Sequence, residues 1–300
     1  MIHLGDITKI SGYEVPVVDC VIGGSPCQDL SIAGKRAGLA GERSGLYMEQ
    51  IRIIKEMRER DVRNNGRADR PVRPRYMVWE NVPGTFSSNK GKDFAAVLEE
   101  TIRIAEPEAP DVPVPPKGWS NAGAIVGVSE DVAGALRAEE HGHQPSVMTY
   151  ATQSYSEIKE SDVGASLKAC GGVYGGGTEN YSISKQSVRR LTPLECERLQ
   201  GFPDGWTDIG EWIDSKGKKH DSSDSARYKA LGNSIALPFW RFLCKRISAQ
   251  YARKATMASL FDGIGGFPLV WEEANGKGSA VWASEIEEFP IAVTKYHFRE

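Results

Sequence analysis

The sequence has little excess charge and no long apolar run. Its 37 lysines and arginines stand against 40 aspartates and glutamates, which gives a net charge of −3. Any contact with a polyanion must therefore come from a local patch. No run approaches 18 uncharged apolar residues, and the opening MIHLGDITKISG lacks the basic-then-apolar design of a leader. We therefore expect neither a membrane span nor a secreted protein.

Cysteine is also scarce, and its spacing excludes two common frameworks. The five cysteines are dispersed and include no CxxC pair; they stand at positions 20, 27, 170, 196 and 244. An odd, scattered set argues against a disulfide framework or a zinc cluster and favours a reducing compartment. The histidines and nearby acids do not have a metal-ligand spacing either: His141, His143, His220 and Asp221. We expect a cytoplasmic protein without a metal.

Glycine, in contrast, is abundant. The chain has 32 glycines in 300 residues, about 11% against the usual ~7%. Such a chain is rich in loops or brings its backbone close to a ligand. At ~150 residues per domain the length favours two domains, or one large domain with an added lobe.

Hydrophobic patterning predicts alternating strands and helices at both ends of the chain. Short apolar runs predict buried strands at 17–22, 76–79, 257–261 and 279–283. Apolar residues at helical spacing predict helices at 46–59, 93–104, 192–199, 234–250, 267–274 and 289–297.

The middle of the chain is less regular. Five prolines lie within 105–118, residues 119–188 show little periodicity, and 210–224 is polar. We therefore expect an α/β domain that is interrupted in sequence by an irregular lobe. The expected divisions are residues 1–124, a small lobe at 125–227, and 228–300.

One glycine-rich segment is typical of a ligand-binding turn. The segment FDGIGGF (261–267) follows a predicted strand and opens a predicted helix. Its glycines let the backbone approach a ligand and place helix N–H groups near it. Glu285 lies after the next strand, where a carboxylate can bind ribose hydroxyls. The alternative is a tight turn that binds nothing, and the pattern alone does not separate a dinucleotide from S-adenosylmethionine.

Two further residues lie just past the ends of predicted strands. Cys27 comes after Pro26 on a turn at the carboxyl edge of the sheet, where helix N-terminal amides can lower the pKa of a thiol. Glu80 follows the strand at 76–79 and is a candidate acid with a raised pKa. The alternatives are a buried structural cysteine and a carboxylate that caps a helix or turn.

Together these segments resemble the cytosine-5 DNA methyltransferase family. The similar blocks cover roughly half of the chain: GDIT (5–8), GGSPCQDLSIAGKRAGL (23–39), ERSGLY (42–47), ENV (80–82), RRLTPLECERLQGFPDGW (189–206), ALGNSIALP (230–238), FDGIGGF (261–267) and SEIE (284–287). The resemblance implies a Rossmann-like sheet that uses S-adenosyl-L-methionine, with a small irregular lobe that recognises the target.

The resemblance also implies a mechanism. The Cys27 thiolate would add to carbon 6 of cytosine, and Glu80 would hydrogen-bond or protonate ring nitrogen 3. Carbon 5 would then accept the methyl group of S-adenosylmethionine. Because the base is inaccessible inside a duplex, it would be flipped out.

Binding roles follow from the same blocks. The residues implied in cofactor binding are Phe261, Asp262, Gly263, Gly265, Glu285, Asp6, Ile7, Leu46 and Asn233. Those implied in DNA binding lie on and beside a loop at 31–39; they are Gln28, Ser31, Lys35 and Arg36. Residues of the block at 189–206 are interpreted as mostly structural: Arg190, Thr192, Glu195 and Arg198.

The chain departs from the family pattern in two ways. The FDGIGGF block, which normally comes first, stands after the GNSI block, so we predict a circular permutation with residues 1 and 300 close together. The family's QxRxR segment is absent between 105 and 150. Its loss is expected to expose a sheet edge beside 76–79 and puts activity in question.

The expected partners are double-stranded DNA and, in a bacterial or phage restriction-modification setting, a cognate restriction endonuclease; the chain is expected to be a monomer. Three other functions stay open: a remnant that binds cofactor or DNA without turnover, an RNA cytosine methyltransferase and, more weakly, a nicotinamide dehydrogenase. The stretch 52–75 has nine basic and four acidic residues. It either touches the DNA backbone or forms a solvated helix face, and we favour the second reading.

Overall fold

The computed structural model describes residues 1–24, 46–65, 71–81, 88–112, 149–154, 157–161, 180–184 and 187–298. The chain separates into two compact units. Unit 1 comprises Met1–Val132, Ile247–Asp262 and Trp271–Ile286, and unit 2 comprises Ala133–Arg246, Gly263–Val270 and Glu287–Glu300.

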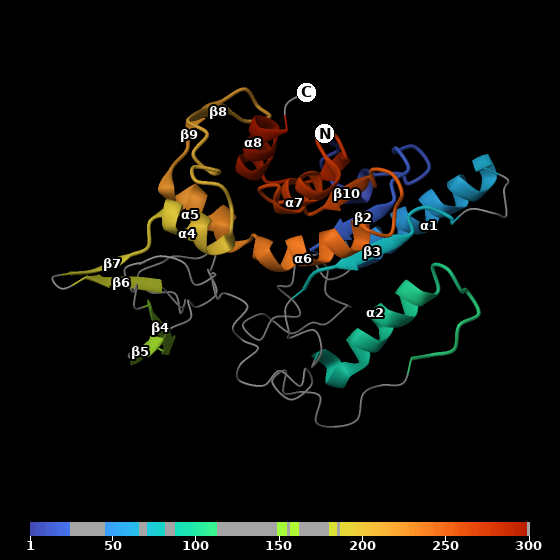
Figure 1. Ribbon diagram of the computed structural model, residues 1–300, viewed down its shortest axis with the longest axis horizontal. Coiled ribbons are helices and arrows are strands. Elements are labelled where there is room, and N and C mark those ends of the chain that lie inside the picture. The colour runs from blue at the N-terminus through green and yellow to red at the C-terminus, as the bar shows by residue number, and fades with distance from the viewer. Residues whose placement is uncertain are drawn as a thin grey trace. The chain divides into compact units, whose positions relative to one another are not determined.

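Unit 1 is built on a five-stranded sheet whose neighbouring strands all run parallel (Figure 1). Its strands lie in the spatial order β1 (Ile2–His3), β11 (Ala280–Ser284), β10 (Met257–Leu260), β2 (Cys20–Gly23) and β3 (Tyr76–Trp79). If β10 is counted first, followed by β11, β1, β2 and β3, this is the 3-2-1-4-5 arrangement of doubly wound nucleotide-binding sheets. The predicted α/β class is confirmed.

The central strands are apolar because both of their faces are covered. Every residue of β2 and β10 is buried, as is typical of parallel strands in α/β proteins. The pairing is flush: Leu260 lies opposite both Gly23 and Ser284, and Gly23 lies opposite Trp79. The carboxyl ends of these strands therefore meet at one edge of the sheet.

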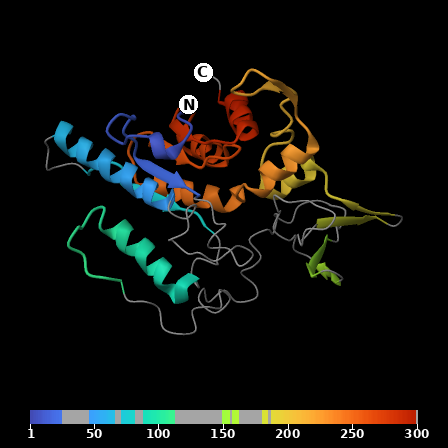
Figure 2. The same ribbon diagram turned by 180° about the vertical axis from the view of Figure 1, so that it is seen from behind.

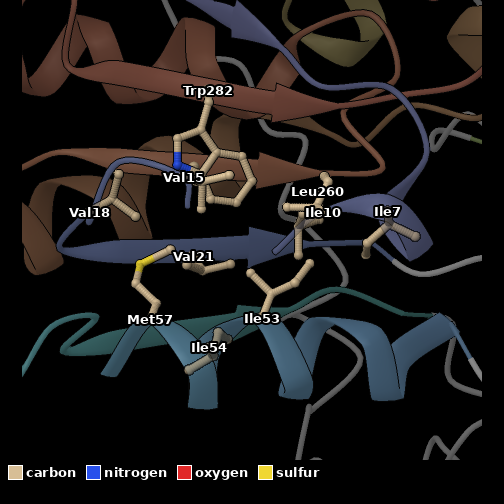
Figure 3. Packing of buried hydrophobic residues seen from close by; sticks show 11 residues of the cluster. Ile7, Ile10, Val15, Val18, Val21, Ile53, Ile54, Met57, Leu260 and Trp282 are labelled. Atoms are coloured by element: carbon tan, nitrogen blue, oxygen red, sulfur yellow. The ribbon is translucent and has the colours of Figure 1, made fainter. Parts of the chain in front are cut away.

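Helix α1 (Leu46–Asn65) covers the sheet with its apolar stripe. Figures 1 and 2 both show it running along β2 and β3. Ile53, Ile54 and Met57 belong to the same buried cluster as Val21 and Trp282, as Figure 3 shows. The helix extends beyond its predicted end at residue 59 because its last turns are polar but bonded: the carboxylate of Asp61 accepts hydrogen bonds from residues 65 and 73.

The basic residues of 52–75 that the structure describes are engaged within the protein. Carboxylates pair with Arg52, Lys55, Arg63 and Arg73. Backbone carbonyls accept from Arg58 and Arg60, and Arg75 lies over the ring of Tyr76. These bonds favour the structural reading of this stretch over a DNA contact.

The rest of unit 1 includes short helices and a buried anchor. The helices are η1 (Ile7–Lys9), η4 (Ser88–Gly91) and α2 (Lys92–Ile102). The fully buried carboxylate of Asp19 accepts from Arg253 at 2.6 and 2.7 Å and from Thr256. This anchor holds the connection that precedes β10 against the beginning of β2.

Unit 2 is mainly helical around an aromatic core. It contains α4 (Pro193–Gln200), α5 (Asp224–Gly232), most of α6 (Leu237–Ser248), the first turn of α7 (Gly266–Asn275) and α8 (Glu288–His297). Trp206 and Trp240 are buried, and their indole N–H groups donate to the carbonyl oxygens of Ile264 and Phe267. The side chains of Cys196 and Cys244 are buried in unit 2, and that of Cys20 is buried in unit 1.

Two parts of unit 2 are more regular than the sequence indicated. A four-stranded antiparallel sheet has the order β5 (Glu157–Ser161), β4 (Thr149–Ser154), β6 (Asn180–Ser184) and β7 (Ser187–Arg190). The polar stretch 210–224 contains a hairpin of β8 (Glu211–Ile213) and β9 (Lys219–Asp221). There Asp214 accepts the amides of Lys216 and Lys218 and closes the turn, so local hydrogen bonds replace an apolar pattern. Among the described residues, no helix is long and apolar enough to cross a membrane.

Candidate functional site

The carboxyl edge of the unit 1 sheet collects the residues that the sequence singled out. Glu285 follows β11, Phe261 and Asp262 follow β10, and Glu80 follows β3. Asp6 comes shortly after β1, and Gly23–Gly24 leads from β2 toward Cys27. The strand order reverses between β10 and β2, and the crevice outside such a switch point is where open α/β sheets bind ligands.

Five predicted residues lie outside the described part of the chain. These are Cys27, Gln28, Ser31, Lys35 and Arg36. Residue 300, expected close to residue 1, is outside it as well. The roles of these residues, and the predicted closeness of the two ends, stay predictions.

Glu80 is fixed at the end of β3 by its backbone. Its N–H donates to the carbonyl oxygen of Gly23 at 2.9 Å, and its carboxylate lies over Gly24. Loss of hydration around the carboxyl raises its pKa. The residue as a whole is exposed, so contact with solvent limits this rise. A carboxyl group whose pKa is raised can hold a proton and donate it, as the predicted role of Glu80 requires.

The turn after β10 has a backbone shaped by its glycines. Phe261, Gly263 and Gly265 all have positive φ, at 55°, 55° and 81°. In unit 2, a Cβ on Gly265 would approach the ring of Phe298 to 2.8 Å. Gly265 therefore allows close packing. A positive φ at Phe261 is strained, and such strain gathers at functional sites.

Asp262 is a buried carboxyl group with only one oxygen engaged. Its exposed fraction is 4%, and Oδ1 accepts from the Ser259 hydroxyl at 2.5 Å. Within the described part of the chain, Oδ2 has no hydrogen-bond partner. Burial, with a smaller contribution from the charge of Glu285, raises the pKa of Asp262 to about 8. An unpaired buried acceptor of this kind suits a cationic ligand group.

The remaining predicted cofactor residues of unit 1 are structurally engaged. Asp6 caps η1 by accepting from the amide and hydroxyl of Thr8, and these hydrogen bonds lower its pKa. Ile7 is buried in the core, its carbonyl oxygen accepts from the Ile10 N–H and from Arg52, and Leu46 packs against the same core. Glu285 is half-buried and accepts the amide of Ile286.

In unit 2, Asn233 is exposed and ends α5. For Asn233 and Gly265 a part in cofactor binding stays a prediction.

The block at 189–206 organises unit 2, as interpreted from the sequence. Thr192 and Glu195 form a reciprocal capping box at the start of α4. Arg198 binds both oxygens of Asp204, at 2.8 and 2.6 Å. Within the described ranges, no group of three or more histidine, cysteine or acidic residues is placed to hold a metal.

The sequence analysis missed two polar residues behind the site. Ser259 bonds to Asp262, and Gln50 lies fully buried on α1 with its amide on the carbonyl of Val78. Gln50 was detectable in principle, since a polar residue there interrupts the apolar stripe of positions 46, 47, 51, 54 and 57. Ser259 lies within a short apolar run and gave no signal.

Comparison with known proteins identifies relatives. Type II methyltransferase M2.BsuMI of Bacillus subtilis (strain 168) is 26% identical over 81% of this chain and 63% of its own length. Type II methyltransferase M1.ScrFI of Lactococcus lactis subsp. cremoris is 27% identical over 78% of this chain and 63% of its own. Orphan methyltransferase M.Rho11sI of Bacillus phage rho11s is 34% identical over 34% of this chain and 18% of its own. The chain thus spans less than two thirds of the length of these relatives.

A family model extends the comparison. The model for C-5 cytosine-specific DNA methylase matches residues 1–104 and 126–249, which include the segments around Cys27, Glu80 and Asn233. The match covers well over half of the sequence, and the five-stranded parallel sheet agrees with it. The chain therefore belongs to the C-5 cytosine-specific DNA methylase family.

Proposed function

We propose that this protein transfers a methyl group from S-adenosyl-L-methionine to carbon 5 of cytosine in double-stranded DNA. The observation that carries the proposal is the convergence of five parallel strand ends at one edge. Each end leads to a residue with a predicted role, and Glu80 and Asp262 there are carboxyl groups whose pKa values are raised. Membership of the family supplies the reaction class that these residues suit.

The residues at the edge fit the cofactor. When bound, S-adenosylmethionine supplies an electrophilic methyl group on a sulfonium centre. The Oδ2 of Asp262, which has no partner among the described residues, would accept from a cationic group of its methionine part. Glu285 would bind the ribose hydroxyls, and Asp6 and Ile7 would border the adenine.

The chain's own groups then activate the pyrimidine. The Cys27 thiolate forms a bond to carbon 6, and the electron pair displaced from the ring is accommodated because Glu80 gives its proton to nitrogen 3. Carbon 5, now electron-rich, would bond to the methyl carbon as the bond between that carbon and the sulfonium sulfur breaks, and the donor would leave as a neutral thioether. A water molecule would then take the proton from carbon 5, the electron pair of that bond would restore the 5,6 double bond and expel the Cys27 sulfur as a thiolate, and nitrogen 3 would return its proton to Glu80.

Covalent trapping tests this proposal. A duplex that carries 5-fluorocytosine cannot lose a proton from carbon 5, so in the presence of S-adenosylmethionine it should remain attached to the protein. Cys27→Ser should abolish the adduct. Cys244→Ala, which changes a buried thiol in unit 2, should retain it. Cofactor binding without an adduct would instead identify a non-catalytic remnant, and methylation of tRNA in preference to duplex DNA would identify an RNA enzyme.

We also propose that the chain is a circular permutant of its family. The 3-2-1-4-5 strand arrangement, counted from β10, supports this, because the conventional first strand here follows α6. Moving residues 251–300 ahead of residue 1 should give a protein with the same circular dichroism and cofactor affinity. Failure of that rearranged protein to fold would contradict the proposal.

We also propose that the family's QxRxR segment is missing from this chain near the interval 105–125, which the family model leaves unmatched. A related enzyme's segment inserted there should raise the rate of adduct formation. An unchanged rate would show that nothing required is absent. We further propose that the protein is a monomer, that it is located in the cytoplasm and that it has a cognate restriction endonuclease. Light scattering of the purified chain tests whether it is a monomer.

A further inference from the structure

Gln50 is a buried polar side chain that the proposed mechanism does not use. It lies near the start of α1 with no exposed surface. Its Nε2 donates to the carbonyl oxygen of Val78 at 3.2 Å, while Oε1 has no partner within the described residues. Burying an unpaired amide oxygen costs about 1–3 kcal/mol, so an apolar residue of similar size would suit the helix better on stability alone.

The orientation of the Gln50 carboxamide follows from its neighbours. If its oxygen and nitrogen were exchanged, an amide oxygen would face the carbonyl oxygen of Val78, and two acceptors would meet without a proton between them. The Nε2 donor therefore belongs on Val78. Val78 lies two positions before Glu80, near the end of β3, which is an edge strand of the described sheet.

Two consecutive glycines make room for the two polar groups. A Cβ on Gly23 would lie 2.4 Å from Gln50 Oε1, and a Cβ on Gly24 would lie 2.9 Å from Glu80 Oε2. The Gln50 carboxamide and the Glu80 carboxylate thus occupy the spaces that side chains at 23 and 24 would take. The carbonyl of Gly23 also accepts the Glu80 N–H at 2.9 Å.

These contacts form a closed ring of interactions, called the circuit below. The Gln50 side chain donates to the Val78 carbonyl, and two residues later the Glu80 N–H donates to the Gly23 carbonyl. Gly23 in turn lies against the Gln50 side chain. We infer that Gln50 is a positioning residue that holds the end of β3, and with it the Glu80 carboxylate, in register with the Gly23–Gly24 segment that leads to Cys27. The inference rests on the proposed function for its catalytic meaning, but the circuit is testable without it.

Gln50→Leu removes the donor while keeping most of the volume. The end of β3 should then relax and Glu80 should move. Because a displacement of about 1 Å at a reacting group can cost up to 10²-fold in rate, we expect adduct formation with 5-fluorocytosine DNA to slow by about 10- to 100-fold. The affinity for S-adenosylmethionine should be unchanged. Met57→Leu, a volume-conserving change on the same buried helix face, should leave the adduct rate unaltered.

Two readouts do not depend on turnover. Carbon-13 NMR of the labelled Glu80 carboxyl should show its pKa falling toward the ordinary value in Gln50→Leu, as the group gains hydration. Thermal unfolding should show coupling between residues 23 and 50. Gly23→Ala alone should lower the melting temperature, and Gln50→Ala in the same chain should recover most of the loss. Gly24→Ala meets Glu80 instead, so Gln50→Ala should not relieve it.

The outcomes separate the two proposals. If the unmodified protein forms no adduct, the proposed function fails, and the Glu80 titration and the thermal coupling still decide the role of Gln50. An unchanged Glu80 titration in Gln50→Leu, or strictly additive effects of Gly23→Ala and Gln50→Ala, would overturn the positioning role. A slower adduct together with a weaker cofactor affinity would overturn it too, because the defect would then be general.

Discussion

Replacing Asp262 by asparagine should remove a pH dependence of stability that this one buried group creates. The substitution keeps the size of the side chain and an acceptor for Ser259, and it removes the ionisable proton. In the folded protein the pKa of Asp262 is raised to about 8, and in the unfolded chain it returns to its ordinary value of 3.8. Between these values the unfolded chain has lost the proton and the folded protein still holds it.

The sign and size of the effect follow from linkage. Below pH 3.8 both states are protonated, so the group makes no difference to stability. As pH rises toward 8, the free energy of unfolding falls by about 1.4 kcal/mol per pH unit. At pH 7, about three pH units above the ordinary pKa, the accumulated penalty is about 4 kcal/mol, and it becomes constant above the folded-state pKa. Asp262→Asn should lack this penalty and be the more stable protein at neutral pH.

Urea unfolding followed by tryptophan fluorescence between pH 5 and 9 measures the effect. The difference in free energy of unfolding between Asp262→Asn and the unmodified protein should grow steadily to about pH 8 and then level off. Asp204→Asn changes an exposed carboxylate whose pKa is lowered, so it should add no slope in this range. Parallel curves for the unmodified protein and Asp262→Asn would refute the reasoning. Calorimetry in two buffers should also show proton release when S-adenosylmethionine binds near pH 7, and Asp262→Asn should abolish it.

Three other outcomes are expected. Arg227→Met leaves the fully buried Glu197 carboxylate without its cationic partner and should lower the free energy of unfolding by about 3–5 kcal/mol. Arg198→Met removes one member of an exposed ion pair and should lower it by at most about 1 kcal/mol. Equal losses for the two variants in urea unfolding would contradict this. Gly265→Ala combines a positive φ with a 2.8 Å contact and should lower the melting temperature far more than Gly205→Ala, which has positive φ but open space; similar shifts would argue against close packing there. Burial lowers the pKa of His297 in the folded protein, so the unfolded chain binds the proton more readily. The free energy of unfolding should therefore decline as pH falls below the unfolded-state pKa near 6.5. His297→Gln should flatten that decline in an acid titration followed by circular dichroism.

Much of unit 1 could be predicted because its sequence and its physics agree. The strand at 76–79 is found at those residues, the bounds of β10 and β11 lie within one residue of the predicted ones, and β2 begins three residues later than predicted. Runs such as CVIG and MASL are buried on both faces, so they read as continuous apolar segments. Glu80, Phe261 and Glu285 were predictable for a related reason, because each directly follows such a run. The two-residue strand β1, which precedes Asp6, was not predicted.

The strands and contacts that the sequence did not predict depend mainly on hydrogen bonds and other polar contacts. The strands of TYATQS and NYSIS pair through their backbones and have no apolar stripe that would have marked them. The β8–β9 hairpin depends on Asp214 closing its turn and on Trp212 stacking against His220, contacts between residues that look solvated in sequence. The Gln50 and Ser259 contacts likewise join segments that are distant along the chain or hidden within a run, and no local pattern encodes them.

The position of β10 has a consequence for how the molecule is made. This strand is the middle of the five, yet it is synthesised after β1, β2 and β3, and its residue 257 pairs with residue 20. Until it emerges, β2 has an open flank and β1 has no neighbour at all, since β11 follows later still. Pairing across such sequence distances is slow, and exposed strand flanks invite association between nascent chains. Production of this protein should therefore depend more on chaperones and low temperature than that of a relative whose middle strand is synthesised first.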